Sequence, residues 1–227
     1  MINNVIASLR RGAIGTMILA FVFVTVEPTV SLGASATSQF TISQTVTSEI
    51  AFATPASNVI MSPSLGGLTG GTAYGATSLA VTTNNMTGYN MTIMASSSLG
   101  MIGNASSSNY IPAYVSSVNG VPDYNFTTPV HSARFGYNVN ATNTPDVVPL
   151  FKYSGSTCNT GSTVDSTHCW LAATTTAVQI INRTLPTPVT GATSTLSFQV
   201  QITSNPSPGL PNDTYVATTT LTATTNP

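Results

Sequence analysis

The chain has 227 residues, of which 5 are Lys or Arg and 6 are Asp or Glu, so charged residues make up only 5% of it. An ordinary soluble domain carries about 25% charged residues. Recognition of DNA or RNA starts from a basic surface, which a net charge of −1 does not supply, so nucleic acid is excluded as a partner. Ser and Thr number 66 and apolar residues make up 41%, which argues against disorder and leaves enough apolar side chains for a core.

Residues 1–36 have the three parts of a secretory signal: the positive stretch MINNVIASLRR, the apolar run GAIGTMILAFVFVTV, and a region with small residues at Ala34 and Ala36. They predict export, cleavage after Ala36, and a protein that is secreted or held at the cell surface. The apolar run is shorter than the ~20 residues that a bilayer span needs. Two alternatives stay open. In the first, the segment is kept as an N-terminal anchor. In the second, it is a pilin-type leader that is cut before the apolar run. We expect contact with the membrane only through this N-terminal segment.

The first segment after the leader alternates over an unusual length. In FTISQTVTSEIAF, apolar side chains fall on even positions from Phe40 to Phe52, with Thr, Ser and Glu between them. This period of two predicts a strand with one buried face. A strand of this length is about twice the usual one. We therefore expect it to bend between sheets or to lend one part to a neighbour.

Further segments with the same alternation follow along the chain, and clusters of Gly, Pro, Asn and Ser separate them. They are TSLAVTT (77–83), GYNMTIMAS (88–96), ARFGYNV (133–139), VVPLFKY (147–153), AVQII (177–181), STLSFQVQIT (194–203) and the closing YVATTTLTATT (215–225).

The first two of these predict a hairpin across NNMTG, and the last two predict a hairpin across the Pro-rich turn. Residues 100–132 keep poor periodicity and are interpreted as a long irregular excursion. The pattern as a whole predicts a single all-β domain over 37–227, an antiparallel β-sandwich with immunoglobulin-like or jelly-roll topology left open.

Several blocks in this order resemble a known group of proteins. They are SPSLGGLTGG, VTTNNMTGYNMTIMASSS, ARFGYNV, the region from CNTGS to INRT, and SNPSPGLPNDTYVATTTLTATTN. The chain is similar over nearly all of its mature part to uncharacterised secreted proteins encoded by ultra-small candidate-phyla bacteria. This resemblance implies an exported β-sandwich surface protein and brings no activity with it. The GYNMTI strand after TTNN is also distantly similar to the WxL domains of cell-wall proteins, although the tryptophan and the terminal motif of those domains are missing here.

The two cysteines, Cys158 and Cys169, bracket the polar loop NTGSTVDSTH. In an exported chain this spacing predicts a disulfide, which would stabilise the fold by roughly 3 kcal/mol in the chain-entropy model. A metal site made by the two cysteines with His168 and Asp165 is the competing interpretation. Paired C-x2-C spacing is absent, so we expect no metal and no cofactor.

The chain offers few groups for catalysis. His131 and His168 are its only histidines, and the acids of the mature part each stand alone in a turn-like context. Acid–base catalysis requires titratable groups that are brought together. We therefore predict no catalytic residue and no enzyme. A hydrolase remains the weakest alternative, and it would require Glu49 to pair with a distant Asp.

Two classes of function remain. The first is an exported structural or adhesive protein of the cell surface, and a filament or pilus-like subunit is one form of it. Its partners would be other copies of itself or surface glycans and proteins. Its free N-terminal strand would complete the sheet of a neighbour. The second is a carbohydrate-binding module in which aromatic rings stack on sugar. The residues considered for such contacts are Trp170, Tyr89, Tyr110, Tyr114 and Tyr124. For Trp170, packing in the core beside the disulfide is the preferred interpretation.

Overall fold

The computed structural model describes residues 35–227, so the predicted leader lies outside the described residues except for its last two positions. The chain divides into two compact units, residues 1–45 and residues 46–227. In the first unit, residues 35–45 have no secondary structure and are exposed. Among residues 35–227, no helix is long and apolar enough to cross a membrane.

The second unit consists of strands, two short 3-10 helices and connecting loops, which confirms the prediction of an all-β chain. The strands are β1 (Ile50–Thr54), β2 (Gly71–Thr83), β3 (Tyr89–Ala95), β4 (Met101–Gly103), β5 (Tyr110–Ile111), β6 (Ala133–Ala141), β7 (Tyr153–Ser154), β8 (Thr157–Cys158), β9 (Val178–Arg183), β10 (Ala192–Ile202), β11 (Tyr215–Val216) and β12 (Thr219–Thr225). The 3-10 helices are η1 (Thr144–Asp146) and η2 (Pro149–Phe151).

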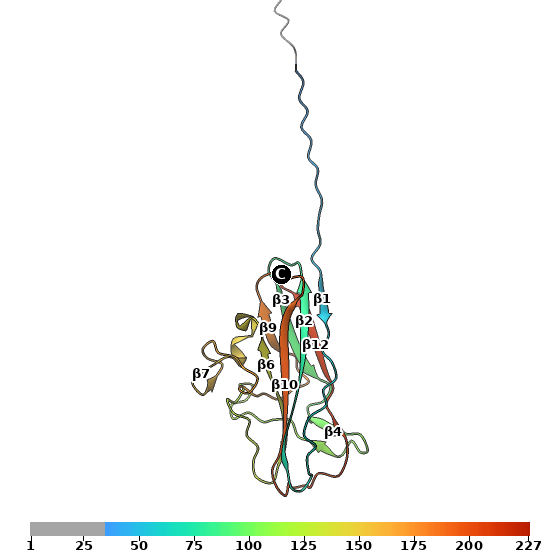
Figure 1. Cartoon of the computed structure of the whole chain (residues 1–227), viewed down its shortest axis with the longest axis vertical. Coiled ribbons are helices and arrows are strands. Elements are labelled where there is room, and N and C mark those ends of the chain that lie inside the picture. Colours follow the sequence, from blue (N-terminus) through green and yellow to red (C-terminus); the bar gives the residue numbers. More distant parts are fainter. Residues whose placement is uncertain (1–34) are drawn as a thin grey trace, which may run out of the picture. The chain divides into compact units, whose positions relative to one another are not determined.

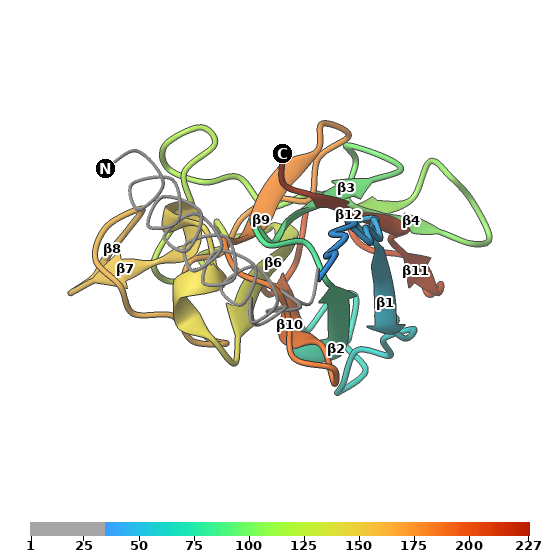
Figure 2. The same cartoon turned by 90° about the horizontal axis from the view of Figure 1, so that it is seen from above.

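Two antiparallel sheets enclose the core. One has the order β1-β2-β10-β6 and the other has the order β12-β3-β9. β10 pairs with β2 over its whole length, from Ala192↔Val81 to Ile202↔Gly71. Seen from above, β9, β3 and β12 lie on one side of the unit and β6, β10 and β2 lie on the other (Figure 2). Smaller sheets are formed by β11-β4-β5 and by β7-β8.

The core forms because each long strand has one apolar face. Leu196, Phe198 and Val200 alternate along β10, and Met91 and Ile93 do the same on β3. These side chains meet between the sheets in one continuous cluster, to which Tyr137 and Phe151 also belong. Alternation at a period of two is therefore what brings the two sheets together.

The two margins of these sheets differ. At the margin of β6 and β9, the segment that contains η1 and η2 covers the edges. Its Val148 N–H donates to Ile180 of β9, and Leu171 exchanges two hydrogen bonds with Tyr137 of β6. At the other margin, β1 and β12 are the last strands of their sheets (Figure 1). Backbone groups are thus covered at the margin of β6 and β9, whereas no strand of the described residues pairs with the outer edge of β12.

Both predicted hairpins are wrong. β2 and β3 follow each other across Asn84–Gly88 but belong to different sheets. In the connection between the sheets, the Asn85 side chain donates to Gly88 O and to Asn226 O, which ties the connection to the end of the chain. The closing strand likewise pairs with β3, and not with β10.

Two further predicted strands differ in the structure. VVPLFKY contains η2 and only the start of β7, because Pro149 cannot donate to a ladder and suits the first position of a helical turn. The long first segment is a strand only from Ile50 to Thr54. Of residues 40–49, Thr47 and Glu49 form hydrogen bonds with Thr83 and Asn84, and none belongs to a strand. Residues 100–132 contain only the short strands β4 and β5.

Neighbouring residues of β3 test the two faces of this strand. Ile93 is 1% exposed and Met94 is 39% exposed. We expect Ile93→Ala to lower the free energy of unfolding by about 2–5 kcal/mol, since it leaves a cavity in the core. Met94→Ala is the matched control and should change it by less than about 1 kcal/mol. Chemical denaturation followed by tryptophan fluorescence measures both, and equal losses would contradict the assignment of faces.

Candidate functional site

A large groove runs along the open margin. It has a volume of about 1220 Å³, above the ~300–1,000 Å³ that is usual for small-molecule pockets. It is lined by Phe52 of β1, by residues of the following segment 55–68 and by residues 210–221. Alternate side chains of β10, from Leu196 to Ile202, line its base. These six residue steps correspond to a length of about 20 Å.

The wall formed by β12 presents unused backbone groups. Thr218 O accepts from Ser96 N–H, and Asn226 N–H donates to Gly88 O. The strand partners between these two bonds run in steady register. Because bonded and non-bonded pairs alternate in an antiparallel ladder, even-numbered residues of β12 bond to β3. The N–H and C=O groups of the odd-numbered residues, Thr219 to Thr225, therefore point to the open edge, where no strand of the described chain pairs with them.

This edge lacks the features that normally prevent pairing with another chain. Proteins protect such edges with Lys, Pro, inward charges or bulges. β12 has the sequence TTLTATT and carries none of these residues, and its pairing with β3 has no bulge. Among the described residues, Asp213 is the only charged side chain in the lining of the groove. Its carboxylate accepts the N–H groups of Thr214 and of Ala105, which lies in the connection between β4 and β5, so it is already bound to backbone donors.

The segment before β1 exposes apolar side chains, whereas the apolar side chains at the base of the groove belong to the core. Phe40, Ile42 and Val46 are 81%, 84% and 79% exposed. In the sequence they share the even-numbered alternation of Ile50 and Phe52, which are partly buried and pack against the core. Residues 37–46, TSQFTISQTV, contain no charge, Pro or Gly. The alternation predicted for this segment thus has a buried partner only at its C-terminal end.

The disulfide predicted between Cys158 and Cys169 is confirmed, with the Cα atoms 5.7 Å apart. It closes a loop that begins at β8 and returns to the core at Trp170. Asn138, a fully buried residue of β6, donates from its side-chain amide to the carbonyls of Asp165 and His168. The loop is therefore fixed to the sheet by hydrogen bonds as well as by the cystine.

A compact polar cluster stabilises this loop. The carboxylate of Asp165 accepts five hydrogen bonds, from the Tyr153 hydroxyl at 2.6 Å, His168 Nδ1 at 2.7 Å, the His168 N–H, and the N–H and hydroxyl of Thr167. Burial raises the pKa of Asp165, but these hydrogen bonds outweigh burial and lower it to about 2. The bond to Asp165 in turn raises the pKa of Tyr153 to about 12.

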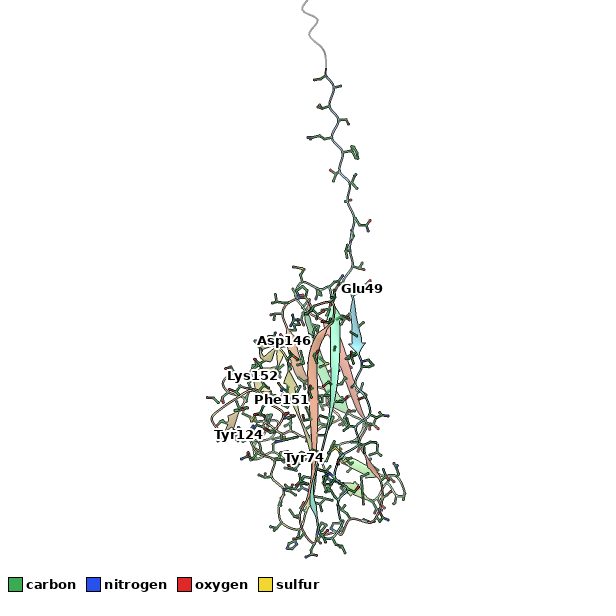
Figure 3. The ribbon with its side chains drawn as sticks, in the orientation of Figure 1. Glu49, Tyr74, Tyr124, Asp146, Phe151 and Lys152 are labelled. Carbon is green, nitrogen blue, oxygen red and sulfur yellow. A yellow bond between two sulfur atoms is a disulfide. The ribbon has the colours of Figure 1, made fainter. Side chains whose placement is uncertain are left out.

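Aromatic rings enclose the histidine of this cluster. The Tyr124 ring stacks on the His168 ring with centroids 4.1 Å apart, and Tyr153 approaches the same ring to 5.3 Å. Tyr124 lies at the margin of the unit near β7 (Figures 1 and 3). Sequence reasoning treated Asp165 as an isolated turn residue and missed these contacts. The spacing of Asp165 and His168 in DSTH, which suits a side chain that closes a turn, was the only available signal.

The cluster holds the loop together and offers no arrangement for metal binding. Within residues 35–227, no group of three or more His, Cys, Asp or Glu side chains is placed to hold a metal ion. The sulfur atoms of Cys158 and Cys169 are bonded to each other. Neither thiol is therefore free to act as a ligand in the metal site that was the alternative interpretation of these cysteines. His131 lies elsewhere and contacts the carbonyls of Ser204 and Asn205.

The five aromatic residues considered for ligand contacts do not share one surface. Trp170 is 2% exposed, donates from Nε1 to Thr167 O at 2.8 Å, and packs edge-on against Phe126. Tyr89 and Tyr114 are also buried. Tyr110 is exposed on β5, and Tyr124 is half-buried in the disulfide cluster. Trp170 is therefore a core residue in this structure.

Comparison with protein-family models, with curated proteins and with solved structures finds no match for this chain.

The low pKa of Asp165 predicts a pH-dependent contribution to stability. Its ordinary pKa is 3.8 and its folded value is about 2, so the stabilisation is complete above about pH 4 and is lost as the pH falls towards 2. We expect Asp165→Ala to be less stable than the parent at pH 6, and this difference to shrink between pH 4 and pH 2. Urea denaturation at a series of pH values measures it.

Two tyrosine variants complete this test. Tyr153→Phe removes one of the hydrogen-bond donors to Asp165. Its loss of stability relative to the parent should change with pH over the same range, and should be smaller than the loss caused by Asp165→Ala. Tyr110→Phe is the matched control, since no side-chain hydrogen bond of Tyr110 is present in the described region. A stability difference for Asp165→Ala that stays constant from pH 6 to pH 2 would show that ionisation of Asp165 does not stabilise the fold.

Proposed function

We propose that this protein is an exported, non-enzymatic structural or adhesive protein of the cell surface, and that its copies assemble by strand addition into filaments. In this proposal the two sheets form a β-sandwich, and the segment before β1 is the strand that one copy gives to the next. The observation that carries it is the exposure of Phe40, Ile42 and Val46, whose alternation in the sequence leads up to the partly buried Ile50 and Phe52.

Exposed side chains of this kind need a partner. Full burial of Phe, Ile or Val contributes ~1.5–3 kcal/mol each relative to exposure in water. Three of them supply about 5–9 kcal/mol, which is comparable to the ~4–15 kcal/mol lost in translational and rotational freedom on association. Apolar contact alone would therefore give weak binding. Backbone pairing along a strand, at ~0.5–1.5 kcal/mol for each hydrogen bond, supplies the remainder.

The composition suits a surface role. Threonine faces outward along β12, where Thr220, Thr222 and Thr224 are exposed and Leu221 and Ala223 are turned inward. Thr both favours strands and hydrates the outer face without charge. The single cystine adds stability that suits an extracellular setting.

Deletion of residues 37–46 tests assembly. The parent chain, expressed with its own leader and collected after export, should form multimers in light scattering and fibres in electron microscopy. The deletion should leave monomers of unchanged thermal stability, because the removed residues are exposed. Monomers from both chains would overturn the proposal.

Side-chain variants make the same test without shortening the chain. Phe40→Ser combined with Ile42→Ser removes apolar contact and should abolish assembly. The matched control, Thr41→Ser combined with Ser43→Thr, changes the polar face of the same segment and should assemble like the parent. Fibres from the first variant would show that the apolar face is not what joins the copies.

A further inference from the structure

We propose that the groove between β1 and β12 is the acceptor site, and that its occupant is residues 37–46 of a second copy of this chain. This inference rests on the proposed function and assigns the surface on which the added strand binds. The occupant would lie beside β12, extend the sheet β12-β3-β9 by one strand, and place its apolar side chains over the base of the groove.

The dimensions of groove and segment agree. Four alternate side chains of β10, at positions 196, 198, 200 and 202, line the base of the groove over six residue steps, and as core residues they are 1–8% exposed. Phe40 to Val46 also covers six residue steps, about 20 Å in extended form, with apolar side chains at 40, 42 and 46. An extended segment of this length therefore reaches from one end of the base to the other.

The backbone groups agree as well. Within the groove, Thr219 and Leu221 direct their N–H and C=O groups to the open edge. A strand beside them would use these groups. Every pairing between the named strands is antiparallel, so addition of one more antiparallel strand continues the existing pattern.

The chemistry of the two surfaces favours a neutral ligand. Of the residues that the structure describes, Asp213 is the only charged one in the groove lining, and its carboxylate is bound to the N–H groups of Ala105 and Thr214. The segment 37–46 has no charged residue. A neutral, extended, alternately apolar peptide is what this lining accommodates, and the chain itself carries one.

The acceptor is tested with a chain that lacks residues 37–46, whose groove has no donor of its own, and a fluorescent peptide of sequence TSQFTISQTV. We expect saturable binding in fluorescence anisotropy. A peptide with Phe40→Ser and Ile42→Ser should bind at least tenfold more weakly. Equal affinity of the two peptides would overturn the inference, because the groove would then not recognise the apolar face.

Proline variants locate the binding edge. Thr219→Pro removes an N–H that β3 does not use, at the first position of β12, where proline is tolerated. It should weaken peptide binding at least tenfold. Thr225→Pro changes the same unpaired side outside the groove and should bind within twofold of the parent. Unchanged binding by a folded Thr219→Pro chain would overturn the inference.

Hydrogen exchange gives a result that needs no substitution in the acceptor. Addition of the peptide should slow exchange of the Thr219 and Leu221 amides, and protection at another edge instead would overturn the assignment.

If the parent chain forms fibres that require residues 37–46 but the peptide binds elsewhere, the proposed function stands and the groove is not the acceptor. If the parent chain remains monomeric while its peptide protects this edge, the occupant belongs to the same copy, and both proposals fail.

Discussion

Backbone hydrogen bonding at the margins of two sheets is the constraint on which this structure depends. A strand at the end of a sheet leaves one row of N–H and C=O groups without partners, and these groups bind water, a covering segment or another strand. At the margin of β6 and β9 the chain supplies the cover itself, through Val148 and Leu171. At the margin of β1 and β12 it supplies none along β12, and the core residues of β10 come to line a groove there. In the proposed assembly, this difference between the two margins provides the face that receives a strand.

The disulfide loop belongs to the covered margin. The cystine, the amide of Asn138 and the carboxylate of Asp165 fix this long loop to β6, and its Trp170 fills the space beneath. The groups that resemble a catalytic pair, Asp165 and His168, make their hydrogen bonds to Tyr153 and to the loop itself. A carboxylate that accepts five donors orders the loop around it, because each bond fixes one backbone or side-chain group in place. The same bonds lower its pKa to about 2, so it stays ionised at acidic pH values at which an ordinary aspartate, with a pKa of 3.8, is half protonated.

Low charge and abundant threonine take on a physical meaning in this arrangement. Charged side chains, lysine above all, are a common means of preventing edge-to-edge pairing. A chain with 5 basic and 6 acidic residues has few of them, and β12 has none. Threonine keeps the outer face of β12 hydrated while the odd-numbered backbone groups of the same strand stay open to pairing. The outer face of β12 is thus hydrated, while the edge of the same strand keeps backbone groups without a strand partner.

The sequence by itself determined the all-β class, the inner and outer faces of β3, β10 and β12, the cystine, and the two-faced character of residues 40–52. Each of these follows from local spacing: a period of two fixes which side chains lie together, and a short loop between cysteines brings their sulfur atoms within reach. Only the tertiary structure decided which strands pair, since β2 and β3 look like a hairpin in sequence, whereas β2 pairs with β10 and β3 pairs with β12. It also decided that Pro149 opens a 3-10 turn, that Tyr153 meets Asp165, and that a groove follows β12. These features depend on contacts between residues far apart in the chain, and no local pattern records which distant partner packs best.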